Sequence, residues 1–114
     1  MRKLALSITA AALIAAAVPA TAASPETATQ KVRDNFFKPK EVTIKKGGKV
    51  TYRWKGSNPH NVALKKPGKS AVFKRSTIKT EGKYSSRFKV VGKWKIVCEV
   101  HPIKMRGRVI VKKS

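Results

Sequence analysis

Residues 41–54 read EVTIKKGGKVTYRW, and this stretch shows most clearly how the chain folds. Two apolar alternations flank its paired glycines: Val42 and Ile44 before Gly47-Gly48, then Val50, Tyr52 and Trp54 after them. Because successive side chains of a strand point to opposite faces, a period of two predicts two strands with one buried face each. The glycines predict a tight turn between them, so we expect a β-hairpin over 41–54.

The same alternation returns in the second half of the chain. Its apolar positions fall into three groups: Tyr84, Phe88 and Val90; Trp94, Ile96 and Cys98; Val109 and Val111. A short apolar strand is also expected over 60–64, whereas 65–82 is rich in Lys, Gly and Pro and predicts one short strand at most. No window shows a sustained helical period. Short strands separated by Gly and Pro predict an all-β sandwich or barrel.

The first 22 residues do not belong to this pattern. Arg2 and Lys3 precede an apolar run over 4–18, and the small-residue sequence Ala20-Thr21-Ala22 follows Pro19. These are the parts of a secretory signal peptide, and the run is shorter than the ~20 apolar residues that span a bilayer. We therefore expect removal of 1–22 and a single domain over 23–114. Its first residues, 23–30, are small and polar and are expected to be a flexible start.

The chain is strongly basic, with 27 Lys and Arg against five acids and a formal charge of +22. Loss of Arg2 and Lys3 would leave the mature chain at +20. Such a surface attracts acidic proteins, anionic membrane faces or nucleic acid, of which export to a periplasm, cell envelope or medium excludes the last. The basic residues are spread along the chain, so a generally basic surface and a dedicated docking face both remain open.

Soft metal ligands are scarce and clustered. After the signal peptide the chain holds only His60, Cys98, His101 and Met105, and the last three fall within eight consecutive residues. An exported chain with one Cys cannot form an internal disulfide, so its thiol pairs between chains, reacts or binds a metal. Two His and one Cys with a weak axial Met form the ligand set of an electron-transferring copper site.

Taken singly, each of these residues also has a more ordinary role open to it. A Cys on an apolar face is usually a small core residue, and a Met before a terminal strand usually fills the core. Cys98 with His101 could be half of a zinc site, but structural zinc sites are closed by Cys or His and not by Met. A Cys-His nucleophile pair would leave His60 and Met105 without a role. Because both His are already used, we expect no enzyme with further copper sites.

At these positions the sequence resembles the small cupredoxins, of the plastocyanin, amicyanin and pseudoazurin kind. Three stretches carry the resemblance: Phe37-Lys38-Pro39 with the following 41–54, the loop Ser57–Val62, and the run from Phe88 to Cys98. Together they span nearly all of residues 23–114. The resemblance implies a single-domain Greek-key β-sandwich of about seven to eight strands.

The resemblance also implies the roles of the ligands. His60, Cys98 and His101 would be equatorial ligands of one copper ion, Met105 the axial ligand, and the Asn61 side chain would tie the two ligand loops together. Three residues separate His101 from Met105, whereas amicyanin-like loops have two and plastocyanin-like loops four. The length of the axial bond from Met105 to copper is therefore the feature that the sequence specifies least. The reduction potential and the colour of the site depend on it.

The implied function is that of a monomeric one-electron carrier outside the cytoplasm, cycling between Cu(I) and Cu(II). An edge of His101 beside Pro102 and Ile103 would form the exit for the electron. Four surrounding bases would steer an acidic redox partner: Lys65, Lys66, Lys104 and Arg106. Two alternatives remain: a copper carrier that hands on the metal, and a cationic surface-binding protein in which the metal is incidental.

Overall fold

The alternation of apolar and polar residues produces two β-sheets in the computed structural model, which describes residues 23–114. The nine strands are β1 (Thr27–Arg33), β2 (Phe36–Lys38), β3 (Glu41–Lys45), β4 (Gly48–Trp54), β5 (Ala63–Lys65), β6 (Lys74–Arg75), β7 (Lys83–Phe88), β8 (Gly92–Val97) and β9 (Arg106–Lys112). The expected signal peptide, 1–22, lies outside the described residues. Within the described part of the chain, no helix has the length and apolar character to cross a membrane.

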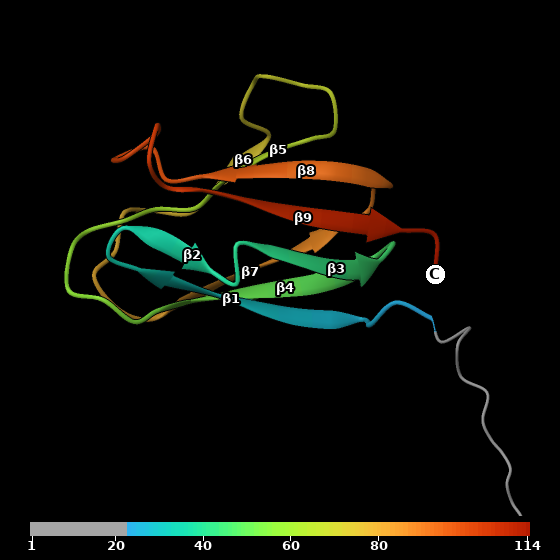
Figure 1. The fold of residues 1–114 in the computed structure, drawn as a ribbon, viewed down its shortest axis with the longest axis horizontal. Coiled ribbons are helices and arrows are strands. Elements are labelled where there is room, and N and C mark those ends of the chain that lie inside the picture. The colour runs from blue at the N-terminus through green and yellow to red at the C-terminus, as the bar shows by residue number, and fades with distance from the viewer. Residues whose placement is uncertain (1–22) are drawn as a thin grey trace, which may run out of the picture.

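The two sheets face each other as a sandwich (Figure 1). One has the strand order β2-β1-β4-β7 and the other β3-β9-β8-β5-β6. β1 pairs with β4 and β3 with β9 in parallel, while the other neighbours are antiparallel. The predicted all-β sandwich is confirmed. The count is nine instead of seven to eight because the pairing includes two very short strands, β2 and β6.

The hairpin predicted over 41–54 is wrong. β3 pairs with β9 in one sheet, with Val42 opposite Val109, whereas β4 pairs with β1 and β7 in the other. The connection crosses between the sheets at Gly47, whose φ is 83° and whose amide donates to the Phe88 carbonyl. A period of two shows that each strand buries one face, but it does not show which strand lies alongside.

The polar start of the chain is also more ordered than predicted. β1 begins at Thr27 and runs parallel to β4 along its edge. Gln30 is fully buried, and its amide nitrogen lies 3.1–3.3 Å from the carbonyls of Pro39, Lys40 and Arg108. Backbone pairing and this buried amide therefore order a segment whose composition is typical of a flexible terminus.

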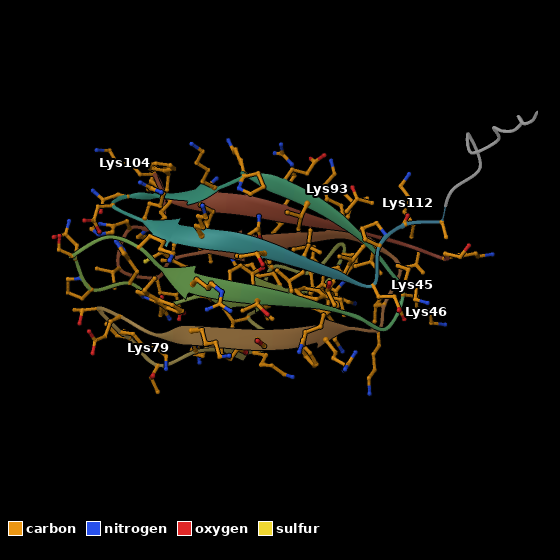
Figure 2. All side chains as sticks on the ribbon, turned by 90° about the horizontal axis from the view of Figure 1, so that it is seen from below. Lys45, Lys46, Lys79, Lys93, Lys104 and Lys112 are labelled. Atoms are coloured by element: carbon orange, nitrogen blue, oxygen red, sulfur yellow. The ribbon has the colours of Figure 1, made fainter. Side chains whose placement is uncertain are left out.

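The outward faces of the strands carry the charge. Lys93 and Lys95 of β8 are exposed and alternate with Trp94 and Ile96, which are buried. Figure 2 shows labelled lysines at both ends of the molecule, with Lys45, Lys46 and Lys112 at one end and Lys79 and Lys104 at the other. The basic residues thus surround the sandwich, in keeping with the spread of Lys and Arg along the sequence.

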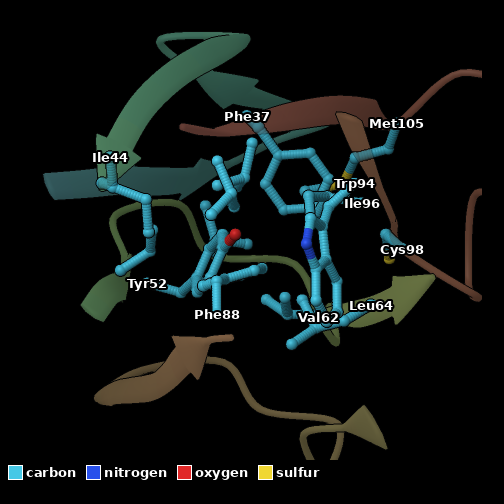
Figure 3. Packing of buried hydrophobic residues seen from close by; sticks show 14 of the residues in the cluster. Phe37, Ile44, Tyr52, Val62, Leu64, Phe88, Trp94, Ile96, Cys98 and Met105 are labelled. Carbon is cyan, nitrogen blue, oxygen red and sulfur yellow. The ribbon is translucent and has the colours of Figure 1, made fainter. Parts of the chain in front are cut away.

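The inward faces build one apolar core (Figure 3). The rings of Phe88 and Trp94 meet edge to face at 4.8 Å between centroids, and the Trp94 indole N–H donates to the Val90 carbonyl at 2.8 Å. Burying one such large side chain contributes about 1.5–3 kcal/mol. Cys98 and Met105 are fully buried at one end of this core, so two candidate metal donors are themselves core residues.

Candidate metal centre

The candidate ligands come from two loops at one end of the sandwich. The loop that precedes β5 carries His60, and the loop between β8 and β9 carries the other three (Figure 1). Both loops lie at the end opposite the C-terminus. β5 pairs antiparallel with β8, with Ala63 opposite Val97, and this pairing brings the two loops together. The strand expected over 60–64 begins only at Ala63, so His60 lies in the loop that precedes it.

The loop 98–105 is closed by its own backbone. The Cys98 amide donates to the Met105 carbonyl at 3.0 Å, and the His101 amide donates to the Cys98 carbonyl at 3.1 Å. The Met105 amide donates to the His101 carbonyl at 2.9 Å, which is one turn of the α type. The three residues between His101 and Met105 are therefore what a single such turn requires. His101 remains partly exposed at its surface side, whereas Cys98 and Met105 are sealed.

His60 is held from several sides. Its backbone forms a two-way bridge with Lys79, with both N–O distances at 2.9 Å, and its carbonyl accepts the Trp54 indole N–H at 3.1 Å. The side chain of His60 is fully buried. Its ring lies 5.3 Å from the ring of His101 between centroids, at an interplanar angle of 61°. The structure thus brings the two imidazoles together over a sequence separation of about forty residues.

The spacing of two of the three fully buried donors, His60 and Cys98, fits a shared metal ion. His60 Nδ1 lies 3.8 Å from Cys98 Sγ, which is long for a hydrogen bond. An imidazole nitrogen and a thiolate bound to one ion at ~2.0 and ~2.3 Å would lie roughly 3.5–3.8 Å apart in tetrahedral or trigonal geometry. Within residues 23–114, no cluster of three or more His, Cys, Asp or Glu side chains is arranged so that it could hold a metal ion by itself. The His60–Cys98 pair is therefore the part of the donor set that the fold has already spaced for a metal.

A carboxylate that does not stand out in the sequence orients His60. Asp34, in the turn between β1 and β2, accepts the His60 Nε2 proton with 2.8 Å between Oδ1 and Nε2. The Ser57 and Asn58 amides donate to the same carboxylate at 2.8 and 3.0 Å. These bonds, that of Ser57 first, lower the pKa of Asp34 to about 2. An ionised carboxylate accepts only, so Nε2 carries a proton, and Nδ1 is the ring nitrogen that faces Cys98.

Asn61 joins the two ligand loops, as the resemblance implied. Its Nδ2 donates to Glu99 Oε1 at 2.7 Å, and the Glu99 amide donates to Asn61 Oδ1 at 2.8 Å. Arg75 clamps the same carboxylate through Nε and Nη2, at 2.8 and 3.0 Å. Arg75, and then Asn61, lower the pKa of Glu99. Neither Glu99 nor Arg75 stood out in the sequence, because each reads as one more surface charge.

The four bases expected around His101 differ in their placement. Lys104 lies exposed in the ligand loop, and Arg106 Nε donates to the Pro102 carbonyl at 2.9 Å. Lys65 and Arg106 both line a surface groove that begins at Pro102 and Ile103 of the ligand loop. Lys66 instead places its ammonium 4.0 Å from the centre of the Phe73 ring, where it forms a cation–π contact. Three of the four thus lie on the ligand loop or in the groove that adjoins it.

Comparison with known proteins identifies the family of this chain. A family described as copper binding proteins, plastocyanin/azurin family, matches residues 26–112. Amicyanin-alpha of Methylorubrum extorquens is 34% identical over 103 residues, covering 89% of this chain and 86% of that protein.

Solved structures agree as well. A reduced amicyanin variant superposes with a TM-score of 0.64 at 28% identity, covering 74% of this chain and 80% of the other. A purple cupredoxin from Nitrosopumilus maritimus, at 24% identity and a TM-score of 0.65 over 75% and 99% of the two chains, shares the fold. The chain belongs to the plastocyanin/azurin family of copper-binding proteins and is a cupredoxin.

Proposed function

We propose that this protein is an exported blue copper protein that binds one copper ion through His60, Cys98, His101 and Met105 and carries single electrons between redox partners. The observation that supports this most is the 3.8 Å separation of His60 Nδ1 and Cys98 Sγ inside the core. A trigonal His₂Cys set with a weak axial thioether supplies a reversible one-electron couple when copper is bound.

The surroundings of the ligands suit electron transfer because they resist rearrangement. Asp34 fixes the His60 ring, Asn61 ties the two loops together, and Cys98 and Met105 are packed in the core. A donor set that stays in place when the metal changes its charge loses little energy in reorganisation. Burial also keeps water away from the Cys98 sulfur.

The contact face for partners lies around His101. Ile103, in the same loop, is 78% exposed, and Val100 is 40% exposed. A groove of about 760 Å³ begins at Pro102 and Ile103 and runs over the outer face of β8 and β9. Its basic residues are Lys65, Lys93, Lys95, Arg106 and Arg108. An apolar contact bordered by such charges fits a partner with an acidic docking face.

The optical spectrum tests the proposed copper site directly. The mature chain loaded with one equivalent of Cu(II) should show an intense thiolate-to-copper absorption in the visible range. Cys98→Ser should abolish this band, and the matched control Ile103→Ala, in the same loop but exposed, should keep it. A copper-loaded wild-type protein without the band would overturn the proposal.

Redox cycling separates an electron carrier from a copper carrier. The copper-loaded protein should be reduced and reoxidised repeatedly, in the presence of an excess of a Cu(I) chelator, with its copper content measured after each cycle. An electron carrier keeps its copper through many cycles. Transfer of the copper to the chelator on the first reduction would favour the copper carrier instead.

Export and steering have their own tests. The protein recovered from outside the cytoplasm should begin at Ala23, which N-terminal sequencing measures.

Reduction of the Cu(II) protein by a small anionic iron complex should be faster than by a cationic complex of similar potential. The difference should shrink as ionic strength rises through 0.1 M, where the Debye length is about 10 Å. Equal rates at low salt would contradict steering by the basic surface.

A further inference from the structure

We infer that Asp34 is a positioning residue that acts through His60: it selects the ring nitrogen that faces the metal and lowers the reduction potential of the site. This inference rests on the proposed function, because it takes His60 as a copper ligand. Asp34 itself faces away from the candidate metal position, since its contact is with the far nitrogen of the His60 ring.

Three directed donors converge on the Asp34 carboxylate. Oδ1 accepts from His60 Nε2 at 2.8 Å and from the Asn58 amide at 3.0 Å, while Oδ2 accepts from the Ser57 amide at 2.8 Å. A carboxylate held by several N–H groups has a fixed orientation. The turn between β1 and β2 therefore locks both the loop 57–58 and the buried imidazole that follows it.

Gly56 shows that the chain makes room for this carboxylate. A Cβ on Gly56 would overlap the Asp34 carboxyl group. Gly56 has no positive φ, so a glycine here is explained by the close approach of Asp34 rather than by the backbone conformation. The carboxylate of Asp34 thus occupies a place shaped for it, although it comes from a part of the chain more than twenty residues earlier.

The consequence for a bound metal follows from charge. An anionic acceptor on Nε2–H increases the electron density at Nδ1, which makes it a better donor to a cation. The more highly charged Cu(II) gains more from this than Cu(I), and it also gains more from a nearby negative charge. Both effects favour the oxidised state and lower the reduction potential. Within residues 23–114, the ring of His101 has no such carboxylate, so the effect belongs to the His60 side.

Three substitutions separate the parts of this inference. Asp34→Asn keeps an oxygen that accepts from His60 Nε2 but removes the charge. Asp34→Ala removes both the acceptor and the charge. Gly56→Ala keeps every charge but displaces the carboxylate. Glu26→Gln is the matched control, because it removes a surface carboxylate that pairs with Lys45 at the other end of the sandwich.

The first measurement needs no copper. Long-range ¹H–¹⁵N spectra of the copper-free mature chain report the tautomer of each His ring. We expect His60 protonated only at Nε2 in the wild type, in Glu26→Gln and in Asp34→Asn, and a mixture of tautomers in Asp34→Ala and Gly56→Ala. An unchanged tautomer in folded Asp34→Ala, with folding verified by circular dichroism, would overturn the positioning role.

The second measurement is the reduction potential of the copper-loaded variants. We expect Asp34→Asn and Gly56→Ala to shift the balance between Cu(II) and Cu(I) affinity about tenfold toward Cu(I), a rise of about 59 mV for a one-electron couple. Glu26→Gln should shift it less than twofold. A shift in Asp34→Asn no larger than in Glu26→Gln would overturn the tuning role. Absence of the thiolate-to-copper band in every variant and in the wild type would instead refute the proposed function and leave the tautomer result standing.

Discussion

The two histidines of the candidate site lie 5.3 Å apart between ring centroids, yet they are held in different ways. His60 is fully buried and is fixed by residues outside its own loop, namely Asp34, Trp54 and Lys79. His101 is partly exposed and is fixed by the backbone turn of its own loop.

This difference indicates a division of roles within one site. The His60 side belongs to the rigid sandwich and determines the donor geometry. The His101 side lies among exposed apolar residues such as Ile103 and would offer a short path between the proposed metal position and a partner. One of the two proposed ligands thus belongs to the core and the other to the surface.

The largest expected effect comes from removing each imidazole in turn. His60→Gly and His101→Gly should each lower copper affinity by more than roughly 100-fold. Removing a ligand weakens metal binding more than removing a residue that hydrogen-bonds to the ligand. Added free imidazole should restore the thiolate-to-copper band in His101→Gly, where the gap opens to solvent, but not in His60→Gly. The measurement is the visible spectrum during an imidazole titration. Equal rescue of both variants would contradict the division into buried and exposed ligands.

The next effect concerns the connection between the two sides. Asn61→Ala removes both side-chain bonds to Glu99 and leaves a buried gap, so the free energy of unfolding should fall by about 1–3 kcal/mol. Asn58→Ala is the control, because the Asn58 side chain is exposed and only its backbone amide is used. Urea unfolding of the copper-free proteins measures both. A similar loss in the two variants would show that Asn61 does not join the loops.

A smaller effect is expected at the exposed side. Ile103→Ala removes an apolar side chain that is 78% exposed, so the free energy of unfolding should change by less than about 0.5 kcal/mol. Electron self-exchange between Cu(I) and Cu(II) forms, measured by NMR line broadening, should nevertheless slow several-fold because the contact patch is smaller. Val90 is exposed in the β7–β8 connection. If Val90→Ala slowed electron self-exchange by the same factor, the surface around His101 would not be the preferred contact surface.

A small effect at neutral pH is also expected far from both histidines. Burial raises the pKa of Tyr52 well above its usual value, and within residues 23–114 its hydroxyl has no hydrogen-bond partner. Tyr52→Phe should therefore change the free energy of unfolding by less than about 1 kcal/mol at pH 7.

The effect of Tyr52→Phe should grow at alkaline pH. Because the pKa is raised in the folded state, the stability linked to Tyr52 is complete below the unfolded pKa of about 10 and is lost as the pH rises above it. Wild type should lose more stability than Tyr52→Phe between pH 9 and about 11. Parallel pH profiles of urea unfolding would contradict this.

Most of the fold could be predicted from local sequence pattern. The alternation in β4, β8 and β9 identifies strands and their buried faces because the face of each side chain depends only on its position within its own strand. The hairpin over 41–54 failed because pairing partners are chosen across the whole sandwich. β3 pairs with β9 and β4 pairs with β1, and neither pairing can be recognised from the residues of 41–54 alone.

The site divides in the same way. Cys98, His101 and Met105 lie close in sequence, and their types and spacing were enough to predict a shared metal centre on one loop. His60 could be added because it completes the set of two His, one Cys and one Met that suits copper. Asn61 could be added through the family resemblance. Asp34, Glu99 and Arg75 could not, because an isolated acid or base in the sequence has no partner until folding supplies one.

The sequence by itself determined the chemistry: which donor atoms exist, which faces of the strands are apolar, and that the surface is basic. Those properties belong to single residues and to their near neighbours. Only the tertiary structure decided that Asp34 meets the far nitrogen of His60 and that the near nitrogen lies 3.8 Å from Cys98. Such contacts join segments brought together by sheet pairing, and sheet pairing is a property of the whole fold.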